Sequence, residues 1–332
     1  MDQAAPVTPP LVAWWDRRQV PLYLAAIGAG ALVGLAWPGV APLLEHAVEP
    51  VLGLLLLATF LGVPMAEVGR GLRDARFLGV VVAANFVAVP LLAWGLSRFV
   101  ADDRALLLGV LLVLLTPCVD YVIVFTGLAG GARARLLAAA PLLMLLQLAL
   151  LPLFLRVFAG GDVVALIEVG PFVRAFIVLI ALPLGAAALI QALARRRGAA
   201  GRVGRRIENG AATGMVPLMM ATLAVVVGSQ IAAVGDELAA LVRVVPLYVA
   251  FVVVAVALGI AVGRLARLDV PATRAVAFST ATRNSLVVLP LALALPAPLA
   301  LAPLAVVTQT LVELVAMVVL VRLLPRLVPH RA

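Results

Sequence analysis

The chain has 332 residues, of which 65% are hydrophobic and only 12% are charged. Soluble domains contain roughly 45 to 50% apolar residues, so this composition predicts an integral membrane protein and excludes an ordinary soluble enzyme. One bilayer span uses about 20 apolar residues. The length therefore accommodates about ten spanning helices and leaves no room for a separate catalytic or nucleic-acid-binding domain.

The formal net charge is +9, and all 25 basic residues are arginines. These arginines gather at the ends of apolar runs, where cytoplasmic loops meet anionic lipid headgroups. We therefore interpret the charge as a sign of membrane orientation and expect no nucleic-acid partner. The single cysteine excludes an internal disulfide, and two histidines at segment edges argue against a zinc site. We expect no cofactor.

The chain is predicted to be an all-α membrane protein with ten transmembrane helices, because ten apolar segments of spanning length follow one another. Asp16, Arg17 and Arg18 precede the first segment, which lacks a clear small-residue cleavage site, so we expect this helix to be retained. The segments cover residues 20–37, 50–66, 77–97, 105–127, 136–158, 170–193, 210–232, 240–263, 274–295 and 299–324.

The connections between these segments alternate in arginine content. Nineteen arginines fall on the side of the two termini, and only four fall on the opposite side: Arg98, Arg104, Arg156 and Arg243. The positive-inside rule then places both termini in the cytoplasm of a multi-pass protein of the bacterial plasma membrane. Of the two remaining arginines, Arg174 lies near the start of a span and Arg283 lies deep inside the ninth.

Ten spans divide into two sets of five, and an odd number means that the second set enters the membrane from the opposite side. This predicts a 5+5 inverted repeat, an arrangement common in secondary transporters. We divide the chain into residues 1–194, which hold the first repeat and span six, an arginine-rich cytoplasmic loop at 195–209, and residues 210–332 with spans seven to ten. The glycines of the loop suggest a flexible connector.

Inverted-repeat carriers have discontinuous helices at matching positions of the two halves, and the fourth and ninth spans fit this expectation. The fourth contains Thr116, Pro117, Cys118 and Asp120 at mid-span. The ninth contains a run of small and polar residues around Arg283, which lies 165 residues after Cys118, about half the chain length. Asn284 and Ser285 belong to the same run, so both breaks are candidate substrate or ion sites.

A charged residue at the centre of a spanning helix costs roughly 2.5 to 3.5 kcal/mol. Asp120 and Arg283 have corresponding depths on the two broken helices, and a paired charge costs less than two separate ones. We therefore hypothesise that they lie close together where the helices cross. The pair either contacts a substrate or a coupling ion, or only holds the crossing together.

Other polar residues at membrane depth give weaker signals. Asn85, five residues before Pro90, either reaches a neighbouring break or bonds a neighbouring helix. Gln309 and Glu313 share one face of the tenth span, and a buried glutamate without a basic partner is a candidate proton or sodium site. Three further glutamines are expected to form interhelical hydrogen bonds: Gln147, Gln191 and Gln230.

Cys118 has two interpretations. A lone cysteine in a membrane helix is usually a small apolar filler. Its position beside Pro117 in a predicted break favours a functional role, because a thiol is the soft ligand that trivalent arsenic prefers.

Together these residues resemble the bile acid/sodium symporter superfamily, and within it the arsenical-resistance permeases. The resemblance rests on the ten spans and on five motifs: Asn85–Phe86 before Pro90, Thr116–Pro117–Cys118, Leu128–Gly131, the break at 282–285, and Gln309 with Glu313. It implies a panel domain of spans one, two, six and seven and a core domain of spans three to five and eight to ten, with the broken helices crossing in the core.

The resemblance also implies a role for Cys118, because the arsenite permeases have a functionally essential cysteine at the matching position. They also have a carboxylate in the ninth span, and this chain departs from them there, since residues 283–287 contain none. Sodium-coupled relatives use the same carboxylate to hold sodium. Transport by this chain is therefore coupled to protons, coupled to sodium or uncoupled, and the sequence does not distinguish these three cases. Arg283 is a candidate substitute for a bound cation, with Asp120 as the negative charge.

The favoured interpretation is a secondary carrier that exports arsenite or a related oxyacid by alternating access, with the substrate between Cys118, Asp120 and Arg283. The alternative is an organic-anion symporter of the same fold, in which Arg283 meets the anion. An intramembrane enzyme is disfavoured because no histidine reaches the midplane and because Asp102 and Asp103 lie in an external loop without partners. A channel would show flux without saturation, and a membrane sensor would show none.

Overall fold

The computed structural model describes residues 14–15, 18–62, 74–119, 121–161, 174, 177–236 and 238–329. Within these ranges the regular secondary structure is helical, which confirms the all-α prediction. The chain forms two compact units, and each consists of two stretches of sequence. One unit contains Met1–Gly62 and Pro183–Gly235, and the other contains Val63–Leu182 and Asp236–Ala332.

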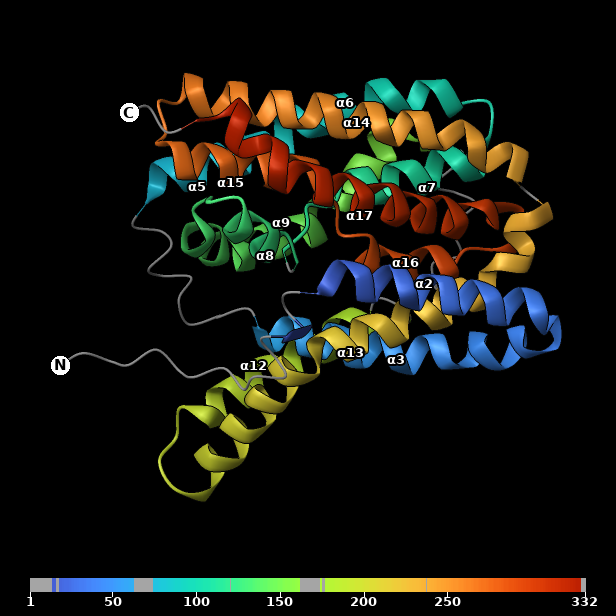
Figure 1. Cartoon of the computed structure of the whole chain (residues 1–332), viewed down its shortest axis with the longest axis horizontal. Coiled ribbons are helices and arrows are strands. Elements are labelled where there is room, and N and C mark those ends of the chain that lie inside the picture. Colours follow the sequence, from blue (N-terminus) through green and yellow to red (C-terminus); the bar gives the residue numbers. More distant parts are fainter. Residues whose placement is uncertain are drawn as a thin grey trace. The chain divides into compact units, whose positions relative to one another are not determined.

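In the described part of the first unit, the short 3-10 helix η1 (Pro38–Val40) accompanies four α-helices, which can be followed in Figure 1. They are α2 (Gln19–Ala36), α3 (Ala41–Gly62), α12 (Leu182–Ala194) and α13 (Ala199–Asp236). Gln191 of α12 donates to the carbonyl oxygens of Phe60 and Leu61 at 3.2 and 3.3 Å, which confirms its predicted interhelical hydrogen bonds.

The prediction of a flexible loop at 195–209 was wrong, because α13 begins at Ala199 and runs through most of that stretch. Arginine is a good helix former, and Gly201 and Gly204 allow close packing, whereas Gly198 has a positive φ of 86° just before α13. A Cβ on Gly204 would meet the backbone nitrogen of Ala194 at 2.5 Å. Arg205 also donates to the carbonyl oxygen of Ala194 at 2.7 Å, so the turn between α12 and α13 is tight.

The second unit contains the remaining helices, of which α14, α15 and α17 lie side by side (Figure 1). In chain order they are α5 (Ala75–Ala83), the π-helix η3 (Ala84–Ala88), α6 (Val89–Ser97), η4 (Arg98–Val100), α7 (Arg104–Leu114), α8 (Tyr121–Leu128), α9 (Arg133–Phe158), η5 (Ile177–Ala181), α14 (Leu238–Leu265), α15 (Val270–Ala281), α16 (Ser285–Leu293), η6 (Ala297–Leu299) and α17 (Leu301–Leu327).

Among the described residues, six helical segments are long and apolar enough to cross a bilayer. They are Ala41–Gly62, Ala75–Val100, Arg133–Phe158, Ala199–Ser229, Ala239–Leu265 and Ala297–Leu327. They correspond to predicted spans two, three, five, seven, eight and ten. The full count of ten spans and the inverted repeat stay predictions.

Arg274 lies inside α15 and is only 5% exposed, whereas the sequence suggested an arginine in a cytoplasmic turn. Its guanidinium donates to the carbonyl oxygen of Val328 at 2.8 and 3.0 Å and to that of Ala129 at 3.0 Å. Carbonyl oxygens at the end of α17 and in the turn after α8 therefore replace lipid headgroups as its partners, and Arg274 ties these segments to α15.

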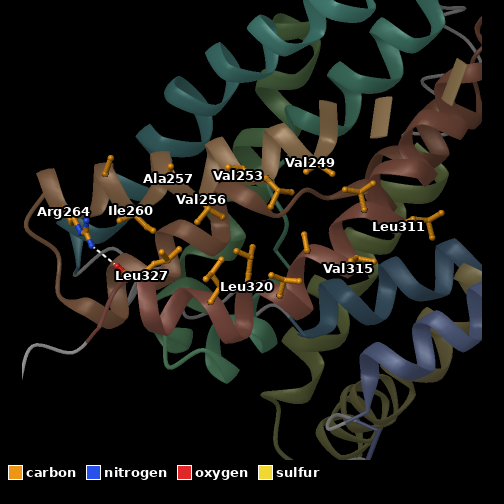
Figure 2. A pocket seen from close by; sticks show the side chains of 16 residues that line it. Val249, Val253, Val256, Ala257, Ile260, Arg264, Leu311, Val315, Leu320 and Leu327 are labelled. Atoms are coloured by element: carbon orange, nitrogen blue, oxygen red, sulfur yellow. Dashed lines mark hydrogen bonds between the residues drawn. The ribbon is translucent and has the colours of Figure 1, made fainter. Parts of the chain in front are cut away.

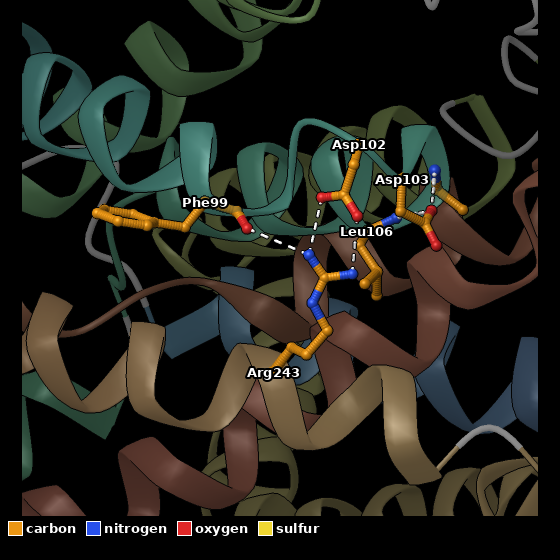
Figure 3. Close-up of polar contacts among 6 residues, drawn as sticks. Phe99, Asp102, Asp103, Leu106 and Arg243 are labelled. Carbon is orange, nitrogen blue, oxygen red and sulfur yellow. Dashed lines mark hydrogen bonds and ion pairs between the residues drawn. The ribbon is translucent and has the colours of Figure 1, made fainter.

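The expectation that Asp102 and Asp103 lack partners was also wrong (Figure 3). Arg243 of α14 donates to both carboxylate oxygens of Asp102 at 2.8 and 2.9 Å. This hydrogen bonding lowers the pKa of the Asp102 carboxyl below its ordinary value of 3.8. Asp103 caps α7 by accepting from the backbone N–H groups of Ala105 and Leu106. The two carboxylates thus fasten the loop between α6 and α7.

Candidate functional site

The predicted breaks in spans four and nine are present, and they meet in the second unit. The chain leaves helical geometry between α7 and α8 and again between α15 and α16. Pro117 and Arg283 form an antiparallel β-bridge at the meeting point. The backbone N–H of Cys118 donates to Thr282 O at 3.1 Å, and that of Asn284 donates to Thr116 O at 2.8 Å. Each break therefore provides a carbonyl oxygen that accepts a hydrogen bond from a backbone N–H of the other.

Arg283 lies at the centre of this crossing, and its side chain is fully buried at 0% exposure. Its Nη2 donates to Asn85 Oδ1 at 2.9 Å and to the carbonyl oxygens of Ser279 and Thr280 at 2.6 and 2.8 Å. Its Nη1 donates to the carbonyl oxygen of Leu114 at 3.3 Å. The guanidinium is thus held by oxygens from three elements.

Asn85 contacts both the break at Arg283 and Ser279 of the neighbouring helix α15, so the structure meets both of its interpretations. It lies in η3 with 0% exposure. Its side-chain nitrogen donates to Ser279 Oγ at 2.9 Å and to the carbonyl oxygen of Val81 at 3.0 Å, while its oxygen accepts from Arg283. Single π-helical turns inside α-helices occur frequently at functional sites.

Glu313 and Gln309 approach the same crossing from α17. Glu313 Oε2 accepts from the backbone N–H of Arg283 at 2.7 Å and from Gln309 Nε2 at 2.6 Å. Both side chains are buried, at 0% and 1% exposure. A carboxylate from α17 therefore lies against the break between α15 and α16.

Several neutral polar atoms of this region are buried and have no hydrogen-bond partner among the residues that the structure describes. They are both amide atoms of Asn284, the hydroxyl of Ser285 and Oε1 of Gln309. All three side chains are at most 1% exposed. Buried polar groups are nearly always hydrogen-bonded in folded proteins, so these atoms are the strongest indication of a place for a polar solute.

The other predicted site residues have different positions. Thr116 lies in the break just after α7, and its hydroxyl donates to the carbonyl oxygens of Leu112 and Val113 in the last turn of that helix. Cys118 is fully buried at 0% exposure, in the break itself. Asp120 lies outside the described residues, so its pairing with Arg283 stays a prediction.

The glutamines predicted to bond neighbouring helices differ in outcome. Gln147 is 1% exposed on α9, and neither of its amide atoms has a hydrogen-bond partner within the described ranges, which therefore do not contain its predicted interhelical bond. The side chain of Gln230 lies outside the described part of the chain.

Two contributors to the site were not singled out from the sequence. Ser279 provides both a hydroxyl and a carbonyl oxygen, and its place in the polar run was its only signal. Phe251 of α14 places its ring centre 5.5 Å from the Arg283 guanidinium carbon, which is a cation–π contact. An aromatic residue in an apolar span gave no signal of this role.

A groove of about 920 Å³ on α14 and α17 is a different feature (Figure 2). Its lining is aliphatic apart from Arg264 at one end, which donates to the carbonyl oxygen of Leu327 at 3.0 Å. A wall of valine, leucine, isoleucine and alanine offers a polar solute no hydrogen bonds. The groove is therefore not the candidate site.

The family model described as "Sodium Bile acid symporter family" matches residues 49–237, which is more than half of the 332 residues. No curated protein matches the chain.

Proposed function

The chain belongs to the sodium bile acid symporter family, and from this premise we propose that it exports an uncharged oxyacid, with arsenite as the leading candidate. Membership makes it a multi-pass membrane protein and a secondary transporter, not an enzyme. It also implies ion-coupled transport of a small molecule. The substrate, the direction of transport and the residues that bind the substrate are parts of the proposal.

The observation that carries the proposal is the group of neutral polar atoms buried beside the crossing. The amide of Asn284 and the hydroxyl of Ser285 can both donate and accept, and Gln309 Oε1 can accept. A solute with hydroxyl groups, each of which donates and accepts, is complementary to such a set. Arsenous acid has three hydroxyl groups and is uncharged near neutral pH.

Cys118 supports the choice of arsenic among such solutes. It occupies the break opposite Thr282 and lies one residue from the bridge to Arg283. A thiol is a soft ligand, and soft ligands select soft metal and metalloid centres. We propose that the substrate occupies the crossing with Cys118 on one side and Asn284 and Ser285 on the other.

Arg283 argues against the organic-anion alternative. Both terminal nitrogens of its guanidinium already donate to protein oxygens, and the side chain is fully buried. An anion that paired with these two nitrogens would have to compete with Asn85 and three carbonyl groups. Charge-assisted hydrogen bonds in a low-dielectric site are costly to break.

We propose alternating access as the mechanism, with the core domain moving against the panel domain while the crossing holds the substrate. The 19 arginines on the side of the termini favour cytoplasmic termini in a bacterial plasma membrane. Asp120 is proposed as a further contact to the substrate or the coupling ion.

Arsenite accumulation in energised everted membrane vesicles tests the proposal, because an exporter fills such vesicles. We expect accumulation with the wild type and at least about a tenfold loss with Cys118→Ser, which corresponds to about 1.4 kcal/mol. Vesicles with an equal amount of folded variant, checked by thermal unfolding, are the control. No accumulation by the wild type would remove arsenite as the substrate, and unchanged accumulation by Cys118→Ser would remove the thiol from the site.

A further inference from the structure

The breaks that create the crossing leave three carbonyl oxygens without their helical partners. In a continuous helix, the carbonyl oxygens of Leu114, Ser279 and Thr280 would accept from the N–H groups of residues 118, 283 and 284. Those donors are used elsewhere: Cys118 donates to Thr282 O, Arg283 to Glu313 and Asn284 to Thr116 O. The three carbonyls instead accept from the guanidinium of Arg283.

The crossing also lies at the C-termini of two helices, where the helix dipole is negative. α7 ends at Leu114 and α15 ends at Ala281, so the C-termini of both helices point at the crossing. A helix C-terminus carries roughly half a negative charge and favours a cation. Asn85 Oδ1 adds a fourth oxygen, and the face of Phe251 adds a further attraction for a cation. We refer to the oxygens of Asn85, Leu114, Ser279 and Thr280 as the oxygen cage.

The family name implies sodium as the coupling ion. Carbonyl and amide oxygens are the ligands that hard cations take in proteins, so the chemistry of the oxygen cage suits such an ion. The space does not, because the guanidinium already lies within 2.6 to 3.3 Å of these four oxygens. A sodium ion and the side chain of Arg283 cannot share this position.

We propose that Arg283 is a covalently tethered cation that fills the oxygen cage permanently and replaces an exchangeable metal ion there. Every copy of the protein carries this cation, so the two broken helices are held together in the absence of sodium. One consequence rests on the proposed carrier function. It is that transport by this chain does not depend on a sodium gradient at this site. The structural part of the proposal does not depend on the substrate.

The test is thermal unfolding of the purified full-length protein in detergent, with choline chloride as the reference salt. Arg283→Ala empties the oxygen cage, and we expect its Tm to fall by at least about 5 °C. Guanidinium chloride at about 10 mM, far below the molar concentrations that unfold proteins, is expected to restore at least about half of that loss by binding the native state. The wild type is expected to have the same Tm in sodium, guanidinium and choline chloride.

Arg243→Ala is the matched control, because it removes an exposed arginine bound to Asp102. Guanidinium is expected to leave its Tm unchanged. Failure of guanidinium to raise the Tm of Arg283→Ala above that of the control would overturn the proposal. If Arg283→Ala does not fold, the wild type decides the question, because a Tm raised by sodium over choline by at least about 2 °C would overturn the proposal and equal values would support it.

These Tm measurements need no transport substrate. An absence of arsenite accumulation would therefore contradict the proposed function and leave the tethered cation standing, while a sodium-stabilised wild type would do the reverse.

Discussion

Glu313→Gln is expected to reduce transport by about 10- to 100-fold while the protein remains folded. Glu313 accepts from the backbone N–H of Arg283 at 2.7 Å and from Gln309 at 2.6 Å, both within the buried crossing. A hydrogen bond to a charged group contributes about 1.5 to 3 kcal/mol. Glutamine keeps the size of the side chain but loses the charge, so the break in the ninth span is held less firmly against α17. Initial rates in vesicles measure this effect.

Glu49→Gln is the control, since it neutralises an exposed carboxylate on α3. Its transport rate should equal that of the wild type. A Glu313→Gln protein that transports at the wild-type rate would show that the carboxylate is a structural acceptor without a part in transport.

Gly109→Ala is expected to lower the free energy of unfolding by about 1 to 3 kcal/mol, with a larger effect for valine. Gly109 lies on α7, where α17 passes closely. An added Cβ would meet the carbonyl oxygen of Ala302 at 2.7 Å and the Cβ of Ala305 at 2.9 Å. Because α7 leads into the break at Cys118 and α17 carries Glu313, separating the two helices should also reduce transport.

Gly79→Ala is the matched control for this prediction. Gly79 lies in α5, and an added Cβ there would have no heavy atom within 4 Å. Alanine has a higher helix propensity than glycine, so the control is expected to be neutral or slightly stabilising. Thermal unfolding and vesicle transport of the two variants, measured together, check both effects. Equal stability of Gly109→Ala and the wild type would contradict the close contact between α7 and α17.

The sequence predicted the breaks well, because proline and charged residues inside apolar spans have few structural explanations. The inclusion of Asn85 and Glu313 in one site was also within reach, as polar groups at membrane depth seek each other. The partners of Arg283 were not predictable. They are mainly backbone carbonyls, which every residue has, and they become available only where a helix ends.

The sequence was misleading about the glycine-rich stretch and about the partner of Asp102. Glycines at 198–204 suggested flexibility, but Gly204 allows α13 to approach Ala194 closely, and only the packed structure distinguishes these roles. Asp102 and Arg243 are 141 residues apart, so nothing in the sequence pairs them. The sequence around the second break also does not reveal its carboxylate. Glu313 contacts this break from α17, which is a different helix.

The meeting of the two breaks is the central feature of the proposed site, and the single native cysteine allows a direct test of it. The backbone N–H of Cys118 donates to Thr282 O, so the two residues lie opposite each other across the crossing. Opposed residues of an antiparallel pair have Cα atoms about 5.5 Å apart, which is within the range that a disulfide spans. Thr282→Cys should therefore form a disulfide with Cys118 on mild oxidation.

Labelling of the denatured protein with a polymer-linked maleimide measures this disulfide, because only free thiols react. Thr126→Cys is the control, since Thr126 is equally buried and lies five residues along α8 from its start. If the two breaks meet, oxidised Thr282→Cys takes up no label, while oxidised Thr126→Cys takes up two labels and the wild type takes up one. Two labels on oxidised Thr282→Cys would contradict the crossing of the fourth and ninth spans.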